Sequence, residues 1–529
     1  MKKRFLMQFL QEFKLTLQKA IQSGLIPEAR SMVQSFHRTG APYDAQIYYL
    51  EAALCYYEAH YPLALLFARL GYERFPDFEP FEELLALLSD TEQEWDHYLP
   101  CPTFDCTFLN QKLRIVIYEN VSELMDYTAR QFHNAFTLLG HEVMIFDHKD
   151  FTASSKELLS FADQGIDFVL LFNNAGSQIT TTNGQNIWDL LGVTCFDYLF
   201  DHPLYYKDDL TRLPRCGVVT CVDRNHVRFI QRFHPNIREV FYFPLGGEYL
   251  PLPQAVPWED RKIDVLYVGS LKNVKDAPQN ALSQYLTDYL IAHPSCTTEA
   301  AFERYLSALL SSQAAPDREN LSLEDVEELS AKVSSDIIDM DSETPSVPVP
   351  EKLLWDVLWK YRFVDMSVNA YYREKMIAML VNSGIPVTVY GYGWEQTDFF
   401  HNPCFHYGKT IDQTECIQKM HQSKIVLNSM PWFKNGTHDR IFNAMLSHAV
   451  CVTDDSVYLK ETFTDQKELV YYQLDAIDKL PEIVKKLLDN PANAIEIAEN
   501  GYQAAILKHT WENRAMELVK KYHHLSSAN

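Results

Sequence analysis

The segment 435–445 (Asn-Gly-Thr-His-Asp-Arg-Ile-Phe-Asn-Ala-Met) places a glycine beside polar side chains that could bind an anion or transfer a proton. The apolar run before it, 424–430, predicts a buried strand, and a second apolar run follows at 449–453. Together they predict a strand, loop, helix and strand, with the polar residues at the carboxyl end of the first strand. Open α/β sheets bind ligands at that end, and a helix N-terminus attracts phosphate. We therefore expect Arg440 to help hold a phosphate-bearing ligand.

The composition of the chain narrows the classes of function. At 529 residues the chain is too long for one core, so two or three domains are expected. A formal net charge of −24 argues against a nucleic-acid-binding protein, which needs clustered Lys and Arg. The scattered cysteines favour reduced thiols in the cytoplasm, and Cys101 and Cys106 lack a second ligand pair, so no metal site is predicted. No apolar run approaches the ~20 residues that a membrane span needs.

Residues 1–105 are predicted to form a helical region of their own. The apolar period as far as about residue 95 is that of helices, with no alternation typical of strands. With Ala45 as the first position, the small residues Ala52, Ala64 and Gly71 fall where two packed helices must approach closely. This spacing resembles a tetratricopeptide repeat. A helical cap packed on the next domain is the alternative interpretation.

A first α/β domain is predicted at 106–255. Buried strands separated by helical patterns indicate a doubly wound parallel sheet. These strands are expected at 113–118, 141–146, 167–172 and 217–222. The proline-rich run 251–257 forms a natural linker, because repeated proline continues neither a helix nor a central strand.

A second α/β domain is predicted at 256–510, followed by a C-terminal helix at 511–529. Its strands are expected at 263–269, 386–390, 424–430 and 449–453. The long gap after the first of these strands has a different character, with a capping-box pattern at Ser322 and Asp325. We interpret 276–365 as a helical insertion.

Two such domains in tandem resemble the GT-B architecture of glycosyltransferases, in which two Rossmann-like domains face a cleft. Gly436 and the later Asn443-Ala444-Met445 stand where the group 1 enzymes carry E-G-F-x5-E-A-M. Further matches resemble the CgeB-type, spore-maturation-like branch. They are Asp201-His202-Pro203, Asp223-x2-His226-Val227, Glu496-x3-Asn500-Gly501-Tyr502 and His509-Thr510-Trp511-Glu512-x-Arg514. The resemblance covers roughly 110–270 and 365–520.

The chain departs from the family motif at both of its glutamates, which are Asn435 and Asn443 here. In the family the second glutamate grips the ribose and the first faces the donor sugar. An amide still forms hydrogen bonds but carries no charge. Asn443 is therefore expected to hold ribose more weakly, and Asn435 cannot stabilise a developing positive charge as a carboxylate would. Retention of anomeric configuration is not implied.

The resemblance implies further donor-binding residues in the loops of the second domain. Gly269 and Ser270 match the family's glycine loop, Lys275 its lysine position, and Arg373 lies near a predicted helix start. The remaining candidates are Gly391, Tyr392, Gly393, Tyr407, Gly436 and Thr437. A solvated surface charge is the alternative for any single Lys or Arg.

The candidates for acid–base chemistry lie in two loops. His438 and Asp439 belong to the phosphate-binding loop, and Asp201 and His202 follow an apolar run of the first domain. An inverting transfer needs a base within hydrogen-bond reach of the acceptor hydroxyl, which Asp201 or His202 could supply. The alternative is that Asp-His-Pro is a turn whose side chains cap local backbone.

The sequence thus predicts a cytoplasmic glycosyltransferase that moves a sugar from a nucleotide diphosphate sugar, with a UDP-sugar expected. No metal and no other cofactor is required if Arg, Lys and helix N-termini hold the diphosphate. The helical region suggests a protein or peptide acceptor. A homo-oligomer is compatible with the sequence. The alternatives are a nucleotide-sugar epimerase or hydrolase on the same fold, and a catalytically degenerate binding module.

Overall fold

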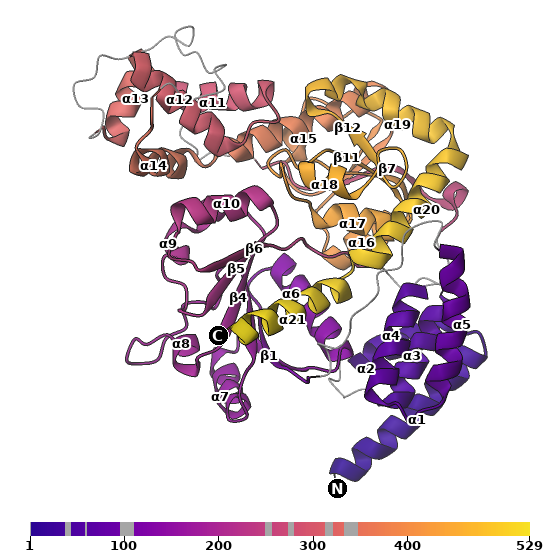
Figure 1. Cartoon of the computed structure of the whole chain (residues 1–529). Helices are drawn as coiled ribbons and strands as arrows, with labels where there is room; N and C mark the ends of the chain where they lie inside the picture. Colours follow the sequence, from indigo (N-terminus) through magenta and orange to yellow (C-terminus); the bar gives the residue numbers. More distant parts are fainter. Residues whose placement is uncertain are drawn as a thin grey trace.

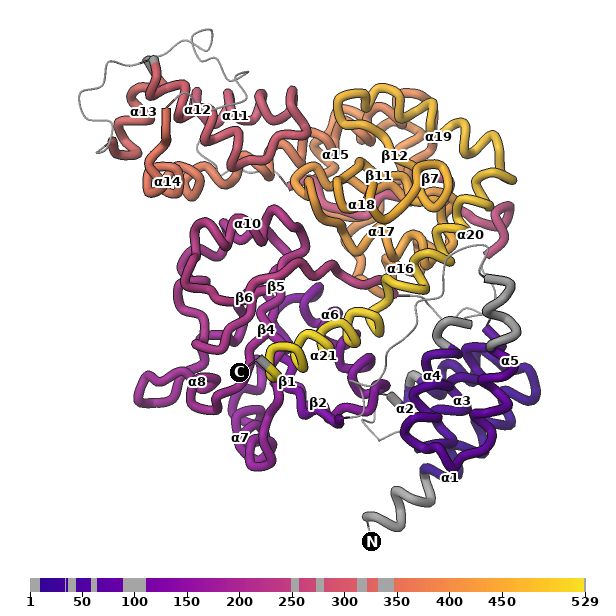
Figure 2. The backbone as a smooth tube through the Cα atoms, in the orientation of Figure 1, coloured from indigo at the N-terminus to yellow at the C-terminus, as the bar shows by residue number. Residues whose placement is uncertain are grey.

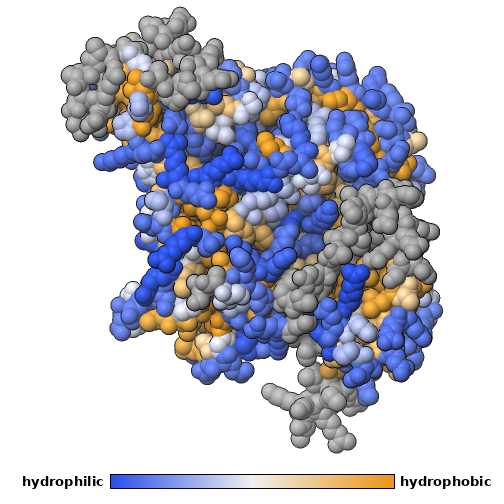
Figure 3. Space-filling view, in the orientation of Figure 1, coloured by the Kyte–Doolittle hydropathy of each residue, from blue (hydrophilic) through white to orange (hydrophobic). Residues whose placement is uncertain are grey.

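The computed structural model describes residues 2–37, 44–58, 61–95, 111–248, 256–272, 280–312, 321–332 and 347–528. Helices at the N-terminus lie beside two α/β bodies, and a helical arm extends from the second (Figures 1 and 2). Hydrophilic residues cover most of the face of the molecule shown in Figure 3. None of the helices in the described ranges is long and apolar enough to cross a membrane.

The first α/β domain holds a six-stranded parallel sheet in the order β2-β1-β3-β4-β5-β6. Strands β1, β3 and β4 are almost fully buried because helices cover both faces, as parallel sheets require. The strand order reverses between β1 and β3. The strands are β1 (Arg114–Glu119), β2 (Glu142–Asp147), β3 (Phe168–Phe172), β4 (Thr194–Leu199), β5 (Gly217–Cys221) and β6 (Glu239–Tyr242). The helices are α6 (Glu123–Leu138), α7 (Phe151–Ala162), α8 (Ile187–Leu191), α9 (Lys207–Leu210) and α10 (Arg224–Phe233), with the 3₁₀ turn η2 (Pro203–Tyr206).

The second α/β domain holds another six-stranded parallel sheet, in the order β12-β11-β10-β7-β8-β9. Counted within the domain this is the Rossmann order 3-2-1-4-5-6, with the reversal between β7 and β10. The strands are β7 (Ile263–Val268), β8 (Val387–Tyr390), β9 (Phe405–Gly408), β10 (Ser423–Leu427), β11 (Val450–Asp454) and β12 (Val470–Tyr472). The helices are α15 (Val364–Asn382), α16 (Gln413–His421), α17 (Asp439–Leu446), α18 (Val457–Thr462), α19 (Leu480–Asp489) and α20 (Pro491–Lys508). The predicted fold class, two doubly wound domains of GT-B type preceded by helices, is confirmed.

The N-terminal helices pack against both α/β domains. They are α1 (Lys2–Gln22), α2 (Ile26–His37), α3 (Ala45–Tyr57), α4 (Tyr61–Arg74) and α5 (Pro80–Trp95). Gly71 lies where α4 meets α5, and a side chain there would clash with the ring of Phe81. The Tyr48 hydroxyl donates to Leu138 O of α6 at 3.1 Å, and Arg74 donates to Leu139 O. The helices therefore cap the next domain, and their tetratricopeptide character stays a prediction.

The last helix, α21 (Trp511–Ala528), returns to the first domain and packs on α6 (Figure 1). The Tyr522 hydroxyl donates to Asp167 Oδ1 at 3.0 Å. Where the chain passes from α20 into α21, the buried Arg514 donates to Leu245 O at 3.2 Å and lies 2.9 Å from His509 Nδ1. This crossing ties the second domain to the first.

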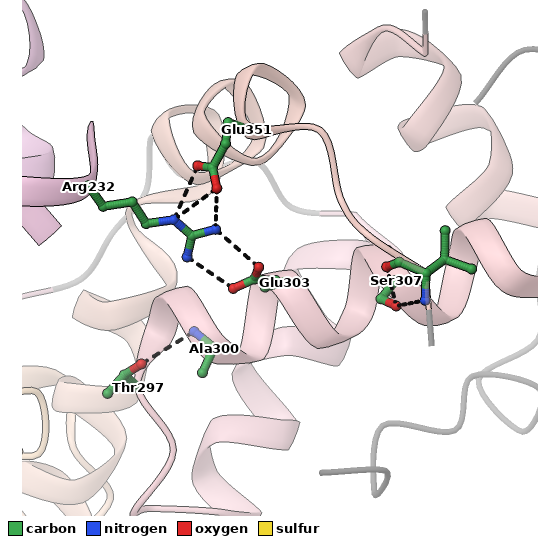
Figure 4. A network of polar contacts seen from close by, with 7 residues as sticks. Arg232, Thr297, Ala300, Glu303, Ser307 and Glu351 are labelled. Atoms are coloured by element: carbon green, nitrogen blue, oxygen red, sulfur yellow. Dashed lines mark hydrogen bonds and ion pairs between the residues drawn. The ribbon is translucent and has the colours of Figure 1, made fainter. Parts of the chain in front are cut away.

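The described residues of the insertion form the helices α11 (Ala281–Ala292), α12 (Thr298–Ser312), α13 (Leu323–Lys332) and α14 (Glu351–Tyr361). Although it belongs to the second domain by sequence, it docks on α10 of the first. Arg232 pairs with Glu303 at 3.0 Å and with Glu351 at 2.6 Å (Figure 4). The ring of Trp355 lies 4.9 Å from that of Phe233. The insertion therefore bridges the two domains.

Replacing Arg232 with alanine is expected to loosen this bridge without unfolding the chain. The three charged side chains are partly exposed, so the cost in stability should be about 1 kcal/mol or less. Amide hydrogen exchange in α12 and α14 should become faster, because these helices lose a shared ionic partner. Arg212→Ala is the matched control, since Arg212 pairs only locally with Asp209 at 3.4 Å. Unchanged exchange in Arg232→Ala would show that apolar contacts alone hold the insertion.

Candidate active site

The loops that follow β7 and β8 meet beside the reversal point of the second sheet, which lies between β7 and β10 and is where such sheets bind ligands. Gly269 N donates to Tyr390 O at 2.8 Å, and Tyr392 N donates to Ser270 Oγ at 3.2 Å. Gly391 has φ +138°, and a Cβ there would lie 2.5 Å from Gly269 O. The close approach of the two loops thus requires glycine. The structure brings Gly269, Ser270, Gly391 and Tyr392 together. Gly393 lies there too, because a side chain on it would clash with Leu271, the residue after Ser270 in the β7 loop.

Arg373 reaches this loop from α15. Its Nη1 donates to Ser270 O at 2.8 Å, while its buried Nε has no partner in the described part of the chain. Tyr407 lies further along the sheet, where its hydroxyl donates to Glu395 Oε1 at 2.5 Å. Lys275 falls outside the described residues.

Arg440 approaches the same point from the first turn of α17. The side chain is only 9% exposed, its Nη1 donates to Asn428 Oδ1 at 2.7 Å, and its guanidinium lies 5.4 Å from the ring centre of Tyr267. Asn428 follows β10 and Tyr267 belongs to β7. Arg440 therefore stands between the two strands at which the sheet order reverses.

His438 and Asp439 form a pair at the start of α17. His438 Nδ1 lies 2.6 Å from Asp439 Oδ1 and 3.2 Å from Arg440 N. Nδ1 can either accept from Arg440 N or donate to Asp439, but not both. We assign it the proton because the contact with Asp439 is the shorter one, and this leaves Nε2 as an acceptor with no partner among the described residues. Gln413 and Asn443 donate to Asp439 Oδ2 at 3.1 and 3.3 Å and fix the carboxylate. The dyad therefore holds a neutral imidazole in one tautomer.

Electrostatics at the dyad favour that neutral imidazole. Burial lowers the pKa of His438 and outweighs the opposing effect of Asp439, and Arg440 and Arg373 lower it further. Burial disfavours the charged carboxylate of Asp439, but His438 and Arg440 together bring its pKa below the ordinary value. Near neutral pH the pair is therefore a carboxylate beside a neutral imidazole.

Several buried polar atoms around Arg440 and the start of α17 have no protein partner in the described ranges. They are Tyr267 Oη, Arg373 Nε, Asn435 Oδ1 and Thr437 Oγ1. Buried polar groups are nearly always hydrogen-bonded, because desolvation without a partner is costly. Atoms of this kind beside two arginines are what a polar, anionic ligand would satisfy.

The two asparagines at the family's glutamate positions contact the first domain and the linker. Asn435 N donates to Asp223 Oδ2 at 2.8 Å, and a side chain on Gly436 would clash with Val222 O. Asn443 Oδ1 accepts from Glu248 N at 2.8 Å. Because both polar atoms of the Asn443 side chain are engaged with protein groups, its expected contact with ribose stays a prediction.

Asp201 and His202 stand apart from the dyad. His202 Nδ1 accepts from Leu204 N at 3.1 Å, which is the capping role considered as the alternative, and Nε2 lies 2.6 Å from Glu299 Oε1. Both ring nitrogens are therefore engaged. Asp201 Oδ2 accepts from Tyr206 Oη at 3.0 Å and is exposed. The sequence offered no signal for Glu299, which lies in the insertion.

Asp454 is a buried carboxyl that sequence reasoning did not single out for chemistry. It ends β11, and both its oxygens accept from Met430 N, at 2.9 and 3.2 Å. Burial raises its pKa to about 7, against the opposing effect of the Met430 hydrogen bonds and of Lys434. The folded protein thus keeps a proton on Asp454 at pH values where the unfolded chain has released it.

Asp454→Asn is expected to gain stability over the parent protein as the pH rises. Between about pH 4 and 7 the folded parent binds more protons than its unfolded chain, so its free energy of unfolding falls with pH. The asparagine variant lacks this dependence. At about 1.4 kcal/mol per unit of pKa, the difference between variant and parent should grow by roughly 3 kcal/mol from pH 5 to pH 8. Urea unfolding at both pH values measures it, and an unchanged difference would contradict the protonated state.

Among the described residues no group of three or more His, Cys, Asp and Glu side chains could hold a metal ion. Cys101 and Cys106 lie outside those residues. Positive charge at the reversal point comes instead from Arg373 and Arg440.

Comparison with known proteins shows which family part of the chain resembles. Residues 373–520, from α15 to α21, match the family described as glycosyl transferase-like. This part of the chain is glycosyltransferase-like. The matched residues include Arg373, His438, Asp439 and Arg440, and the match supports a glycosyltransferase. No curated protein matches the sequence closely.

The solved structures that resemble this chain share little sequence with it. They include sucrose-phosphate synthase from Thermosynechococcus elongatus, with 9% identity and a TM-score of 0.41 over 79% of this chain and 100% of that one. A glycosyltransferase from Rickettsia africae has 8% identity and a TM-score of 0.41 over the same shares. An alpha-glucosyltransferase in complex with UDP-glucose and DNA has 11% identity and a TM-score of 0.43 over 78% and 100%. At these scores the likeness says nothing further about this chain.

Proposed function

We propose that this glycosyltransferase takes its sugar from a nucleotide diphosphate sugar bound at the reversal point of the second sheet. The observation that carries the proposal is the convergence of Arg373, Arg440 and buried polar atoms without partners at the N-terminus of α17. Arginine forms paired hydrogen bonds with phosphate oxygens, and the helix N-terminus adds partial positive charge. These groups stabilise the diphosphate as it leaves, so no metal ion is needed for that step.

The base and ribose would extend over the loops that follow β8 and β9. Tyr392 is half exposed and offers its ring, and Gly391 and Gly393 leave the backbone open to close approach. A UDP-sugar is the donor predicted from the sequence. Asn443 would contact ribose only if its bond to Glu248 N opened.

His438 is the proposed proton acceptor. The acceptor hydroxyl would lose its proton to Nε2 while its oxygen bonds to the anomeric carbon. The bond between that carbon and the diphosphate breaks, and the diphosphate departs with the electron pair. Asp439 holds the imidazole in the required tautomer and stabilises the imidazolium that forms. His202 is less suited to this step because both of its ring nitrogens are engaged.

The acceptor contributes a hydroxyl. A protein or peptide acceptor was expected from the N-terminal helices, which pack on α6 and α20 and lie at the opposite side of the molecule from the insertion (Figure 1). That expectation stays a prediction.

A donor panel tests the proposed function. The full chain is incubated with UDP-, GDP- and dTDP-sugars, and free nucleotide is measured with and without acceptors. Nucleotide release that rises with an acceptor is the expected result. Nucleotide release that no acceptor increases would indicate a hydrolase. Conversion of the donor into an isomeric nucleotide sugar would indicate an epimerase. Nucleotide binding without turnover would indicate a degenerate module, and calorimetry without any nucleotide binding would contradict the donor site itself.

A further inference from the structure

A cavity of about 510 Å³ lies between the two domains and the insertion. Its walls come from α10, from the loops that follow β10, β11 and β12, and from the turn between α11 and α12. The proposed donor site is built on the loops of β7, β8 and β9 and on the start of α17, and of its residues Asn435 also lines the cavity. The cavity has the volume of sites that enclose small molecules.

The wall supplied by the insertion is held in place by the first domain. The turn 293–297 leads directly into α12, whose Glu299 pairs with His202 at 2.6 Å and whose Glu303 pairs with Arg232 (Figure 4). Lys434 of the β10 loop donates to Pro294 O in the turn. The cavity is therefore complete only when the insertion bridges both domains.

The lining of the cavity combines planar polar groups with apolar surface. Asn225, Asn435 and Gln473 supply amides, Asp475 a carboxylate, and Phe433 an apolar face. Asn435 is 8% exposed, and its Oδ1 has no partner in the described part of the chain. Amide and carboxylate groups suit neighbouring hydroxyls, and an apolar face suits the C–H side of a sugar ring.

Charge in the cavity is of both signs. Arg228 is exposed at the wall and makes no hydrogen bond or ion pair with the described residues, while Lys460 pairs with Asp455 at 2.8 Å. A lipid would leave these polar groups unpaired, and a strongly anionic ligand would meet Asp475 and the Asp455 carboxylate. An uncharged molecule with many hydroxyls satisfies the lining best.

Asn435 belongs to both sites. It lines the cavity, and it lies three residues before His438 in the loop at the reversal point. We propose that the cavity binds the acceptor of the proposed transfer, and that this acceptor is a carbohydrate. The proposal rests on the function proposed above and gives the insertion a role: its α11–α12 turn forms one wall of the acceptor site.

Binding measurements on the full chain test this assignment. The probes are maltose, cellobiose, lactose and chitobiose, together with a serine-containing tetrapeptide. Saturation-transfer NMR follows each one with and without UDP. At least one disaccharide should bind the parent protein. Ser295→Trp, at an exposed position on the cavity wall, should weaken that binding more than tenfold, because the indole fills the space. Ser160→Trp, exposed on α7, is the matched control and should bind as the parent does.

Arg228→Ala is the second variant, because removal of an exposed side chain without a partner should not disturb folding. It should weaken disaccharide binding about tenfold, as expected for loss of one hydrogen bond from a charged group. The affinity for UDP should stay within twofold in all three variants. Three results would overturn the proposal. The first is that the parent binds no disaccharide, the second that Ser295→Trp binds disaccharides as well as the parent does, and the third that Ser295→Trp loses only the binding of the tetrapeptide. Failure of the parent to bind UDP would count against the donor site, and the disaccharide result would still decide the cavity.

Discussion

Arg440→Ala is expected to weaken the binding of a nucleotide diphosphate about 100-fold or more. The guanidinium is buried between β7 and β10, where a charge-assisted bond to phosphate is worth several kcal/mol. A loss of about 2.7 kcal/mol corresponds to that factor. Isothermal titration of UDP into the full-length variant measures the change.

Two further variants separate the charge from the fold. Arg440→Ala also removes the partner of Asn428 Oδ1, so some loss of stability is expected and must be measured by thermal unfolding. Arg440→Lys keeps the charge but not the paired hydrogen bonds, and should bind UDP with intermediate affinity. Arg215→Ala removes a largely exposed arginine of the first domain and should leave UDP binding unchanged. A folded Arg440→Ala protein with the parent's affinity would show that the diphosphate lies elsewhere.

His438→Gln is expected to lower kcat by about 10²- to 10⁴-fold and to leave the affinity for UDP nearly unchanged. The glutamine amide oxygen can accept from Arg440 N at the start of α17, but it cannot accept a proton from the acceptor hydroxyl, which is the contribution of a general base. Initial rates of transfer and UDP titrations on the same preparation separate the two effects. A parallel fall in affinity and in kcat would indicate that His438 binds the donor.

The pH dependence of the parent gives an independent test of the same residue. Only neutral imidazole accepts a proton, so the rate should rise with pH through the pKa of His438 and then level off. Because burial lowers that pKa below its ordinary value of 6.5, the plateau should already be reached near neutral pH. Asp439→Asn removes the carboxylate that fixes the tautomer, and should lower kcat and shift the rising limb to lower pH. A rising limb unaffected by this substitution would contradict the dyad.

Local sequence patterns predicted the elements well, because strands and caps depend on neighbouring residues. Strand β1 lies within one residue of its predicted range, and Ser322 and Asp325 form the predicted mutual capping bonds. Strand β6 was missed because its apolar run, 240–243, is short and ends at Pro244; the strand lies at the edge of its sheet and is only half buried.

Contacts between distant segments could not be predicted in this way. The His202–Glu299 pair joins residues 97 positions apart, and the bond from Glu248 N to Asn443 joins residues 195 apart. Each depends on how the linker and the insertion run over the domains, which periodicity does not encode. For the same reason the sequence could not rank its four acid–base candidates, Asp201, His202, His438 and Asp439. The structure pairs His202 with Glu299 and His438 with Asp439.

A crystal structure of the full chain with UDP is the sharpest test of the proposed donor site. We expect the diphosphate at the N-terminus of α17, within hydrogen-bonding distance of the guanidinium of Arg440 and close to that of Arg373. The uracil should lie over the loops that follow β8 and β9. A nucleotide bound in the cavity beside Arg228, or anywhere away from the junction of β7 and β10, would contradict it.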